Sequence, residues 1–121
     1  MLDVQDIHTY YDDSYILQGV SLNVHHGEIV CLLGRNGAGK STTIKSIMGY
    51  CPPRKGKVEF SGKDITGQPV YKNVRMGLGY VPEDRRIFSN LTVQENFEVS
   101  HPPSAEVKWA IDELFDMFPL L

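Results

Sequence analysis

Alternating apolar and polar residues mark the beginning of the chain as strand-forming. Residues 17–24 alternate in this way, and residues 56–61 repeat the pattern later in the chain; residues 2–7, with Leu2, Val4 and then Ile7, also predict a strand. A period of two is typical of a strand with one buried face. The polar run 10–14 separates the first two segments and predicts a turn between them.

Two other apolar runs show no alternation. Residues 29–33 read Ile-Val-Cys-Leu-Leu, and residues 78–81 form a shorter run that ends at Pro82. Continuous apolar runs of this length are typical of strands that are buried on both faces of a parallel sheet. We therefore expect residues 29–33 to be a buried central strand and residues 78–81 to be a second short strand.

A helical signal lies close to each of these apolar runs, after the first run and before the second. Ile44, Ile47 and Met48 share one face of a short helix, which Gly49 is placed to end. Residues 69–77 predict another short helix, with a proline at its start and a glycine at its end.

The last third of the chain is expected to be helical. Thr92 and Glu95 have the spacing of a capping box that opens a helix. Residues 104–118 place apolar side chains at helical spacing, and we expect this stripe to pack in a core.

Charge is distributed unevenly over the 121 residues, whose net charge is −3. Residues 1–34 carry five acidic and no basic side chains, residues 35–86 carry 11 basic and four acidic ones, and residues 87–121 carry one basic and six acidic ones. A basic middle segment suits an anionic ligand. The acidic whole and the lack of a basic stripe interleaved with aromatic residues argue against nucleic-acid binding. Cys31 and Cys51 belong to no C-x-x-C pair, and we expect reduced thiols.

The most specific signal is the sequence GRNGAGKS at residues 34–41, which matches the phosphate-binding pattern G-x-x-x-x-G-K-[ST]. Glycines at 34, 37 and 39 can adopt backbone conformations that direct several N–H groups at one anion. Lys40 would supply a positive charge to the terminal phosphates, and Ser41 a hydroxyl ligand to Mg²⁺. The start of the following helix would add its positive dipole end.

Several segments together resemble the ATP-binding subunit of ABC transporters. These are GRNGAGKSTT at residues 34–43, the preceding residues 17–34, residues 56–67, and GYVPEDRRIFSNLTVQENF at residues 79–97, which resembles the family's Q-loop region. The last segment is most similar to the subunit that serves branched-chain amino acid uptake. The resemblance covers essentially the whole chain but only the first half of the family's domain.

The resemblance implies an α/β fold with a P-loop NTPase core, a strand-rich antiparallel entry region and the start of a helical subdomain. Residues 1–98 would form part of the nucleotide-binding core, and residues 99–121 would begin the helical subdomain. The ATP-binding residues it implies are Tyr11, which would stack on adenine, and Gly34, Arg35, Asn36, Gly37, Ala38, Gly39, Lys40, Ser41 and Thr42 around the phosphates.

Glu83 falls where the family usually has glutamine, and the branched-chain type resembles this sequence in having glutamate at that position. The resemblance implies that Ser41 and Glu83 bind Mg²⁺ and that Lys40 and Glu83 act in catalysis. An exposed acidic turn at Glu83 and Asp84 is the structural alternative. The chain lacks the family's later catalytic acids, its L-S-G-G-Q segment and its switch histidine. We therefore expect a fragment that binds ATP without turnover, although full members of the family are ATP hydrolases.

As a family member the chain would energise an importer, with branched-chain amino acids as the solute, or urea and short amides as an alternative. Its partners would be hydrophobic permease subunits and a second ATP-binding subunit. It would be cytoplasmic, held at the inner face of the plasma membrane through the permease. No signal peptide is recognisable.

Three other functions stay open. A non-catalytic nucleotide-binding or interaction module would agree with the absence of the family's later catalytic acids, L-S-G-G-Q segment and switch histidine. A kinase or GTPase would carry a base-recognition motif such as N-K-x-D, which is not seen. A soluble ABC-type ATPase that acts on nucleic acid or ribosomes fits the charge and the Glu83 segment poorly.

Overall fold

The computed structural model describes residues 1–84, 86–100 and 111–119. These residues fall into two compact units, Met1–Leu78 and Gly79–Leu121, and each is described by itself. No helix in the described part of the chain is long and apolar enough to cross a membrane.

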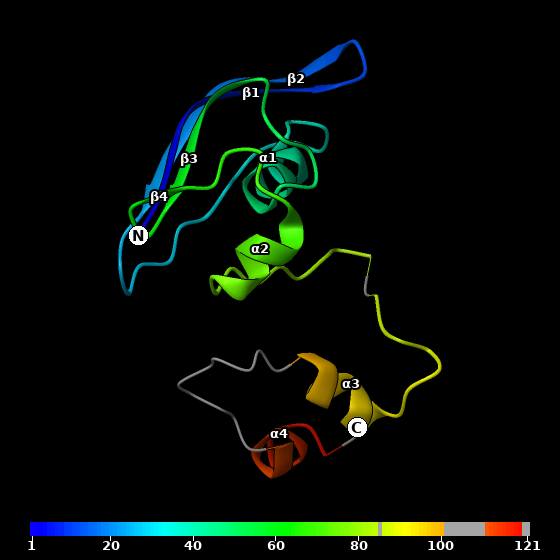
Figure 1. Ribbon diagram of the computed structural model, residues 1–121. Helices are drawn as coiled ribbons and strands as arrows, with labels where there is room; N and C mark the ends of the chain where they lie inside the picture. The colour runs from blue at the N-terminus through cyan, green and yellow to red at the C-terminus, as the bar shows by residue number, and fades with distance from the viewer. Residues whose placement is uncertain (85, 101–110, 120–121) are drawn as a thin grey trace. The chain divides into compact units, whose positions relative to one another are not determined.

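A four-stranded antiparallel sheet organises the first unit (Figure 1). Its strands run in the order β2-β1-β3-β4. The strands are β1 (Leu2–Tyr11), β2 (Ser14–Val24), β3 (Lys55–Phe60) and β4 (Lys63–Asp64). The three strands expected at 2–7, 17–24 and 56–61 are thus confirmed, although β1 and β2 extend further into their hairpin. The turn between them narrows to residues 12 and 13.

A backbone irregularity in β1 changes which side chains reach the core. Val4 and Ile7 are both buried although they lie three residues apart, which would place them on opposite faces of a regular strand. The pairing of β1 with β2 shifts register between these two residues. Asp6 takes up the extra residue with a φ of 46°, and its N–H donates to the Ser21 hydroxyl.

Two helices complete this unit, one between β2 and β3 and one after β4. They are α1 (Lys40–Met48) and α2 (Val70–Arg75), and both begin and end close to the expected positions. The helix α1 ends at Gly49, whose left-handed conformation lets the backbone N–H groups after the helix reach the Lys45 and Ser46 carbonyls. Pro69 precedes α2 as its N-cap residue.

The hydrophobic core joins the sheet to α1. It consists of Val4, Ile7, Leu17, Ile47, Val58 and Ile65. Polar contacts tie the same elements together, since the buried Thr9 of β1 hydrogen-bonds the Ser46 hydroxyl of α1 at 2.8 Å. The fully buried Asn73 of α2 donates to the Met48 carbonyl at 3.0 Å and accepts from Gln68 at 2.8 Å.

The two strands predicted from continuous apolar runs are wrong for this chain. Residues 29–33 form no strand but an open connection from β2 towards α1 (Figure 1), and Cys31 among them is exposed. Residues 78–81 form no strand either, and the Val81 side chain is 92% exposed. A strand needs neighbours that pair with its N–H and C=O groups, and no strand of the described sheet lies beside these runs.

The second unit is helical where it is described. It contains α3 (Val93–Ser100) and α4 (Ile111–Met117), and the Phe97 and Phe115 rings meet edge to face with centroids 6.1 Å apart. The capping box is confirmed, because the Thr92 N–H donates to Glu95 at 2.8 Å and the Glu95 N–H donates to Thr92 Oγ1 at 3.2 Å. The expected helix over 104–118 is observed over Ile111–Met117, and its first part lies outside the described residues.

Candidate functional site

The glycine-rich loop, Gly34–Thr42, leads from the open segment into α1. Gly37 and Gly39 both have positive φ, at 83° and 93°. The Ala38 N–H donates to the Arg35 carbonyl at 3.1 Å and closes a tight turn inside the loop. The backbone is therefore bent as the spacing of the motif predicts, with its glycines in conformations that other residues rarely adopt.

Glycine is also required at position 39 because the Leu17 side chain of β2 leaves no room for a Cβ atom there. A Cβ atom at this position would lie 2.7 Å from Leu17 Cδ2. Leu17 is a buried core residue of β2, so it has little room to move away. The loop thus rests directly on the hydrophobic core, which fixes where α1 begins.

The N-terminus of α1 is left open to an anion. Its N-cap residue, Gly39, provides no side-chain cap, and the first turn contains no acidic residue. The Thr43 N–H and hydroxyl both donate to the Gly39 carbonyl, at 2.8 and 2.9 Å. The N–H groups of the first turn and the positive end of the helix dipole can therefore stabilise a phosphate at this point.

Lys40 bends back over the loop that precedes it. Its Nζ donates to the carbonyl oxygens of Gly34 at 2.8 Å and Arg35 at 2.9 Å. These contacts hold the ammonium group against the mouth of the loop, where it adds a full positive charge to the helix dipole. This combination of backbone donors and one flexible cation suits a phosphate chain.

Tyr11 ends β1 beside the start of α1. Hydrogen bonding to the Cys51 thiol raises the pKa of the Tyr11 phenol, and burial raises it further, while the Thr42 hydroxyl lowers it. The phenol therefore lies near the last residue of the loop, and it stays neutral at physiological pH. The ring is 40% exposed, so part of it is open to a ligand.

The structure separates Tyr11 from its neighbour Tyr10, which could be confused with it in the sequence. The Tyr10 ring stacks on Tyr15 at a centroid distance of 4.5 Å, and the Arg54 guanidinium lies 4.6 Å from the Tyr10 centroid. Successive residues of a strand point to opposite faces. Tyr10 is thus occupied by its own stack, and Tyr11 is the ring that lies near the loop.

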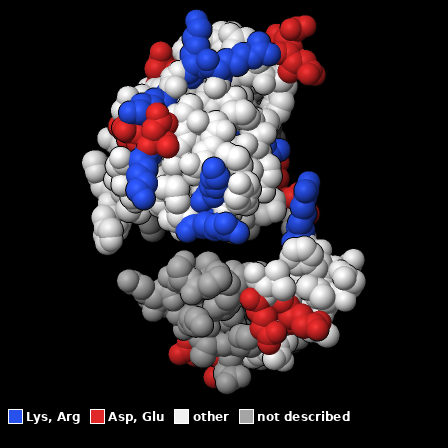
Figure 2. Space-filling model, in the orientation of Figure 1, with Lys and Arg blue, Asp and Glu red and all other residues white. Residues whose placement is uncertain are grey.

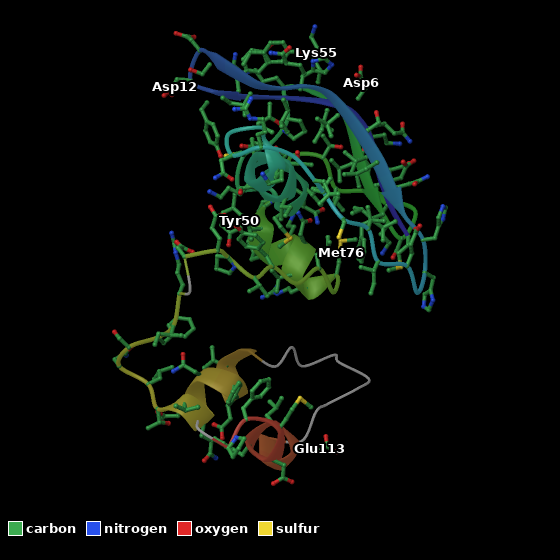
Figure 3. All side chains as sticks on the ribbon, turned by 180° about the vertical axis from the view of Figure 1, so that it is seen from behind. Asp6, Asp12, Tyr50, Lys55, Met76 and Glu113 are labelled. Atoms are coloured by element: carbon green, nitrogen blue, oxygen red, sulfur yellow. The ribbon has the colours of Figure 1, made fainter. Side chains whose placement is uncertain are left out.

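The turn that presents Tyr11 depends on an aspartate in an unusual conformation. Asp12 lies at the hairpin tip (Figure 3) with a φ of 50°, which short polar side chains tolerate better than others. Arg54 donates to the Asp12 carbonyl at 2.9 Å and ties the tip to the chain before β3.

Glu83 belongs to the second unit, where it lies in an exposed turn. Beside it, Arg86 and Asp84 form an exposed ion pair at 2.6 Å. The structure thus brings Tyr11 and the loop together within the first unit, and the roles of Glu83 in metal binding and catalysis stay predictions. Figure 2 shows basic side chains over the first unit and a group of acidic ones on the second.

Two residues near the loop have no signal in the sequence. Cys51 contacts Tyr11, and the positive charge of Lys45 lowers the pKa of the same phenol. Neither belongs to a motif. The length of α1 and the turn at Gly49 bring Lys45 and Cys51 close to the Tyr11 phenol, so only the folded chain shows these interactions.

Comparison with known proteins identifies the family. A profile described as ABC transporter matches residues 17–120, which include the whole loop. The chain therefore belongs to the ABC transporter family.

Individual relatives agree with this assignment. The chain is 36% identical over its full length to the high-affinity branched-chain amino acid transport ATP-binding protein BraG of Pseudomonas aeruginosa, and covers 53% of it. It is 38% identical to the lipopolysaccharide export system ATP-binding protein LptB of Escherichia coli, over 78% of this chain and 39% of LptB. The chain thus spans about half of BraG and less of LptB.

Solved structures show the same fold. A dimeric ATP-binding cassette bound to ADP and phosphate, in a post-hydrolysis state, matches with a TM-score of 0.74 at 26% identity. The match covers 93% of this chain and 52% of that structure. The antiparallel entry sheet and the loop before α1 are therefore the first half of a cassette of this type.

Proposed function

We propose that this chain binds MgATP as the first half of the ATP-binding subunit of an ABC importer. The observation that carries the proposal is the loop over Gly34–Thr42, with two glycines at positive φ and a helix start that no acidic side chain neutralises. Lys40 and the loop N–H groups would bind the phosphates, and the Tyr11 ring would stack on adenine.

The same residues fit the metal that accompanies the nucleotide. The Ser41 hydroxyl follows Lys40 at the start of α1, and Mg²⁺ prefers such oxygen ligands together with phosphate oxygens. Glu83 is proposed as the second protein ligand. The ion would neutralise charge on the phosphates, while this chain's own residues bind and orient the nucleotide.

The solute is proposed from similarity to relatives. BraG matches over the whole chain, including the segment around Glu83, and supports branched-chain amino acid import. LptB matches a shorter part at similar identity, so lipopolysaccharide export is a second candidate. In either case we propose permease subunits and a second ATP-binding subunit as partners, and a position on the cytoplasmic face of the membrane through the permease.

Isothermal titration of the purified chain with MgATP tests nucleotide binding. We expect Lys40→Ala to weaken binding by at least about tenfold, because it removes a charge-assisted contact worth about 1.5–3 kcal/mol. Arg54→Ala is the matched control, since it removes a cation of the same unit whose printed contacts are to Tyr10 and Asp12. Equal affinities for the chain and for Lys40→Ala would contradict the proposal.

Hydrolysis is tested in the same preparation. We expect the isolated chain to bind MgATP and to release no phosphate above the rate of the Lys40→Ala variant. The physical reason is that phosphoryl transfer to water needs a residue that positions or deprotonates the water, and the motif for it is absent from the sequence. Phosphate release that depends on Lys40 would overturn this part of the proposal.

A further inference from the structure

The strand β2, Ser14–Val24, forms an edge of the sheet that is open to another strand. It pairs with β1 on one side, and no strand of the described sheet pairs with its other side. No backbone hydrogen bond joins β2 to a segment outside the sheet in the described part of the chain. Because alternate residues of a strand direct their N–H and C=O groups to opposite sides, about half of these groups are available to an added strand.

The two edges of the sheet differ in the features that usually prevent such pairing. The opposite edge strand, β4, consists only of Lys63 and Asp64, which are both charged. In contrast, β2 has 11 residues, and none of them is charged or a proline. Short length and charge protect an edge from added strands, and β2 has neither.

A bulge restricts the regular part of this edge to the second half of β2. Gly19 has a φ of 82°, and its two neighbours in β2 pair with consecutive residues of β1. The extra residue bends the strand at this point. The part that continues beyond the bulge is Val20–Val24, which is about 17 Å long.

The sequence of this part, Val-Ser-Leu-Asn-Val, is complementary to itself. The half-buried residues Val20, Leu22 and Val24 alternate with Ser21 and Asn23, which are exposed. If two copies pair antiparallel about Leu22, each valine lies opposite a valine, and serine lies opposite asparagine. Every pair then joins side chains of the same polarity, and no charges are brought together.

The length of the regular part favours this register over its neighbours. A two-fold axis at Leu22 pairs the whole of Val20–Val24 with the same residues of the second copy. An axis at Ser21 or Asn23 keeps the polarity matched, but it leaves part of this stretch opposite the bulge at Gly19 or the turn after Val24. More backbone groups are therefore paired when the axis passes through Leu22.

We propose that β2 is a self-association edge, at which a second copy of this chain adds an antiparallel Val20–Val24 strand centred on Leu22. The two four-stranded sheets then join into one continuous sheet. The contact needs only the hairpin of β1 and β2, so the inference does not depend on nucleotide binding. One pair of short strands buries little surface, and the dimer is therefore weak and reversible.

Sedimentation equilibrium of the purified chain under reducing conditions, from about 10 μM to about 1 mM, measures the association. We expect the dimer fraction to rise over this range. Asn23→Lys should weaken the dimer by about threefold or more, because an edge lysine opposes strand addition and the two lysines lie on the same face of the joined sheet. Gln5→Lys is the matched control and should leave the dimer unchanged, since Gln5 is an exposed residue of β1, one strand in from the edge.

Single cysteines test the register. In a Cys31→Ser, Cys51→Ser background, oxidised glutathione should link two Leu22→Cys chains, because opposite residues lie about 4.5–5.5 Å apart, within the reach of a disulfide. Val20→Cys chains alone should link at least about tenfold more slowly, since their Cα atoms are about 13 Å or more apart in this register. A mixture of Val20→Cys and Val24→Cys chains should link as fast as Leu22→Cys chains.

Three outcomes would overturn the proposal. These are a chain that stays monomeric at about 1 mM, equal weakening by Asn23→Lys and Gln5→Lys, and Val20→Cys chains that link as fast as Leu22→Cys chains. The Lys40→Ala variant should dimerise as the unchanged chain does. Dimers that bind no MgATP would therefore contradict the proposed function alone, and monomers that bind MgATP would contradict this inference alone.

Discussion

Gly37 and Gly39 share a left-handed backbone conformation but have different surroundings. A Cβ at Gly37 would meet nothing within 4 Å, whereas a Cβ at Gly39 would approach Leu17 Cδ2 to 2.7 Å. We expect Gly37→Ala to destabilise the chain by about 1–2 kcal/mol, the strain of a left-handed alanine. Gly39→Ala adds overpacking of the core, which typically costs about 1–3 kcal/mol more.

Urea denaturation of the two alanine variants, beside the unchanged chain, measures this difference in the free energy of unfolding. Equal effects of the two substitutions would show that Leu17 can move aside, and would contradict the view that the loop rests on the core.

At the residue scale, the motif predicted the bent backbone at Gly37 and Gly39, because the spacing of the glycines is set by local backbone geometry. Lys40 and the glycines follow from eight consecutive letters. The partner of Gly39 in β2, Leu17, and the thiol beside Tyr11 could not be found in this way, because they lie far from the loop in the sequence and meet it only in the folded chain.

At the element scale, the helix α3 begins with an exchange of hydrogen bonds that includes a carboxylate. The backbone N–H and the hydroxyl of Thr92 both donate to Glu95, and these bonds hold the pKa of Glu95 below its ordinary value of 4.5. A carboxyl whose pKa is lowered by folding stabilises the folded state above its unfolded pKa. The contribution is lost as the pH falls through the folded value.

We expect the α3 N-terminus to loosen selectively below about pH 4.5, because protonation of Glu95 weakens the capping box. Amide exchange at Thr92 and Glu95, followed from pH 6 to pH 3 by NMR, measures it. The Glu95→Gln variant keeps an acceptor but cannot titrate, so its exchange should lack this acid-dependent step. The same step in Glu95→Gln would assign the change to another group.

The elements that could be predicted are those with a local cause. The β1–β2 hairpin follows from alternation, α1 from the glycine loop and the stop at Gly49, and α3 from its capping box. The strands expected at residues 29–33 and 78–81 are not observed. A strand forms only where a neighbouring segment pairs with its backbone N–H and C=O groups, and no partner for these two runs is part of the described sheet.

At the scale of the whole molecule, the hydrophobic core cluster found among the described residues belongs to the first unit. Every member of the core cluster, from Val4 to Ile65, lies within Met1–Leu78, as do Tyr11 and the Gly34–Thr42 loop. We expect a truncated chain of residues 1–78 to keep the dispersed amide spectrum of the first unit and its affinity for MgATP. Two-dimensional NMR and titration calorimetry measure the two properties.

A Val58→Asp variant of the truncated chain is the control, because an unpaired carboxylate in the core should abolish both properties. Collapse of the amide spectrum on truncation alone would show that the second unit contributes to the stability of the first.

The sequence by itself determined the family, the glycine-rich turn before α1 and the local starts and stops of the helices, since each depends on residues close together along the chain. Only the tertiary structure decided that β1 carries a bulge at Asp6, that Tyr11 and not Tyr10 lies near the loop, and that Ile29–Leu33 is open. These features depend on which segments are present to pack and pair, and hydrophobic pattern alone does not specify that.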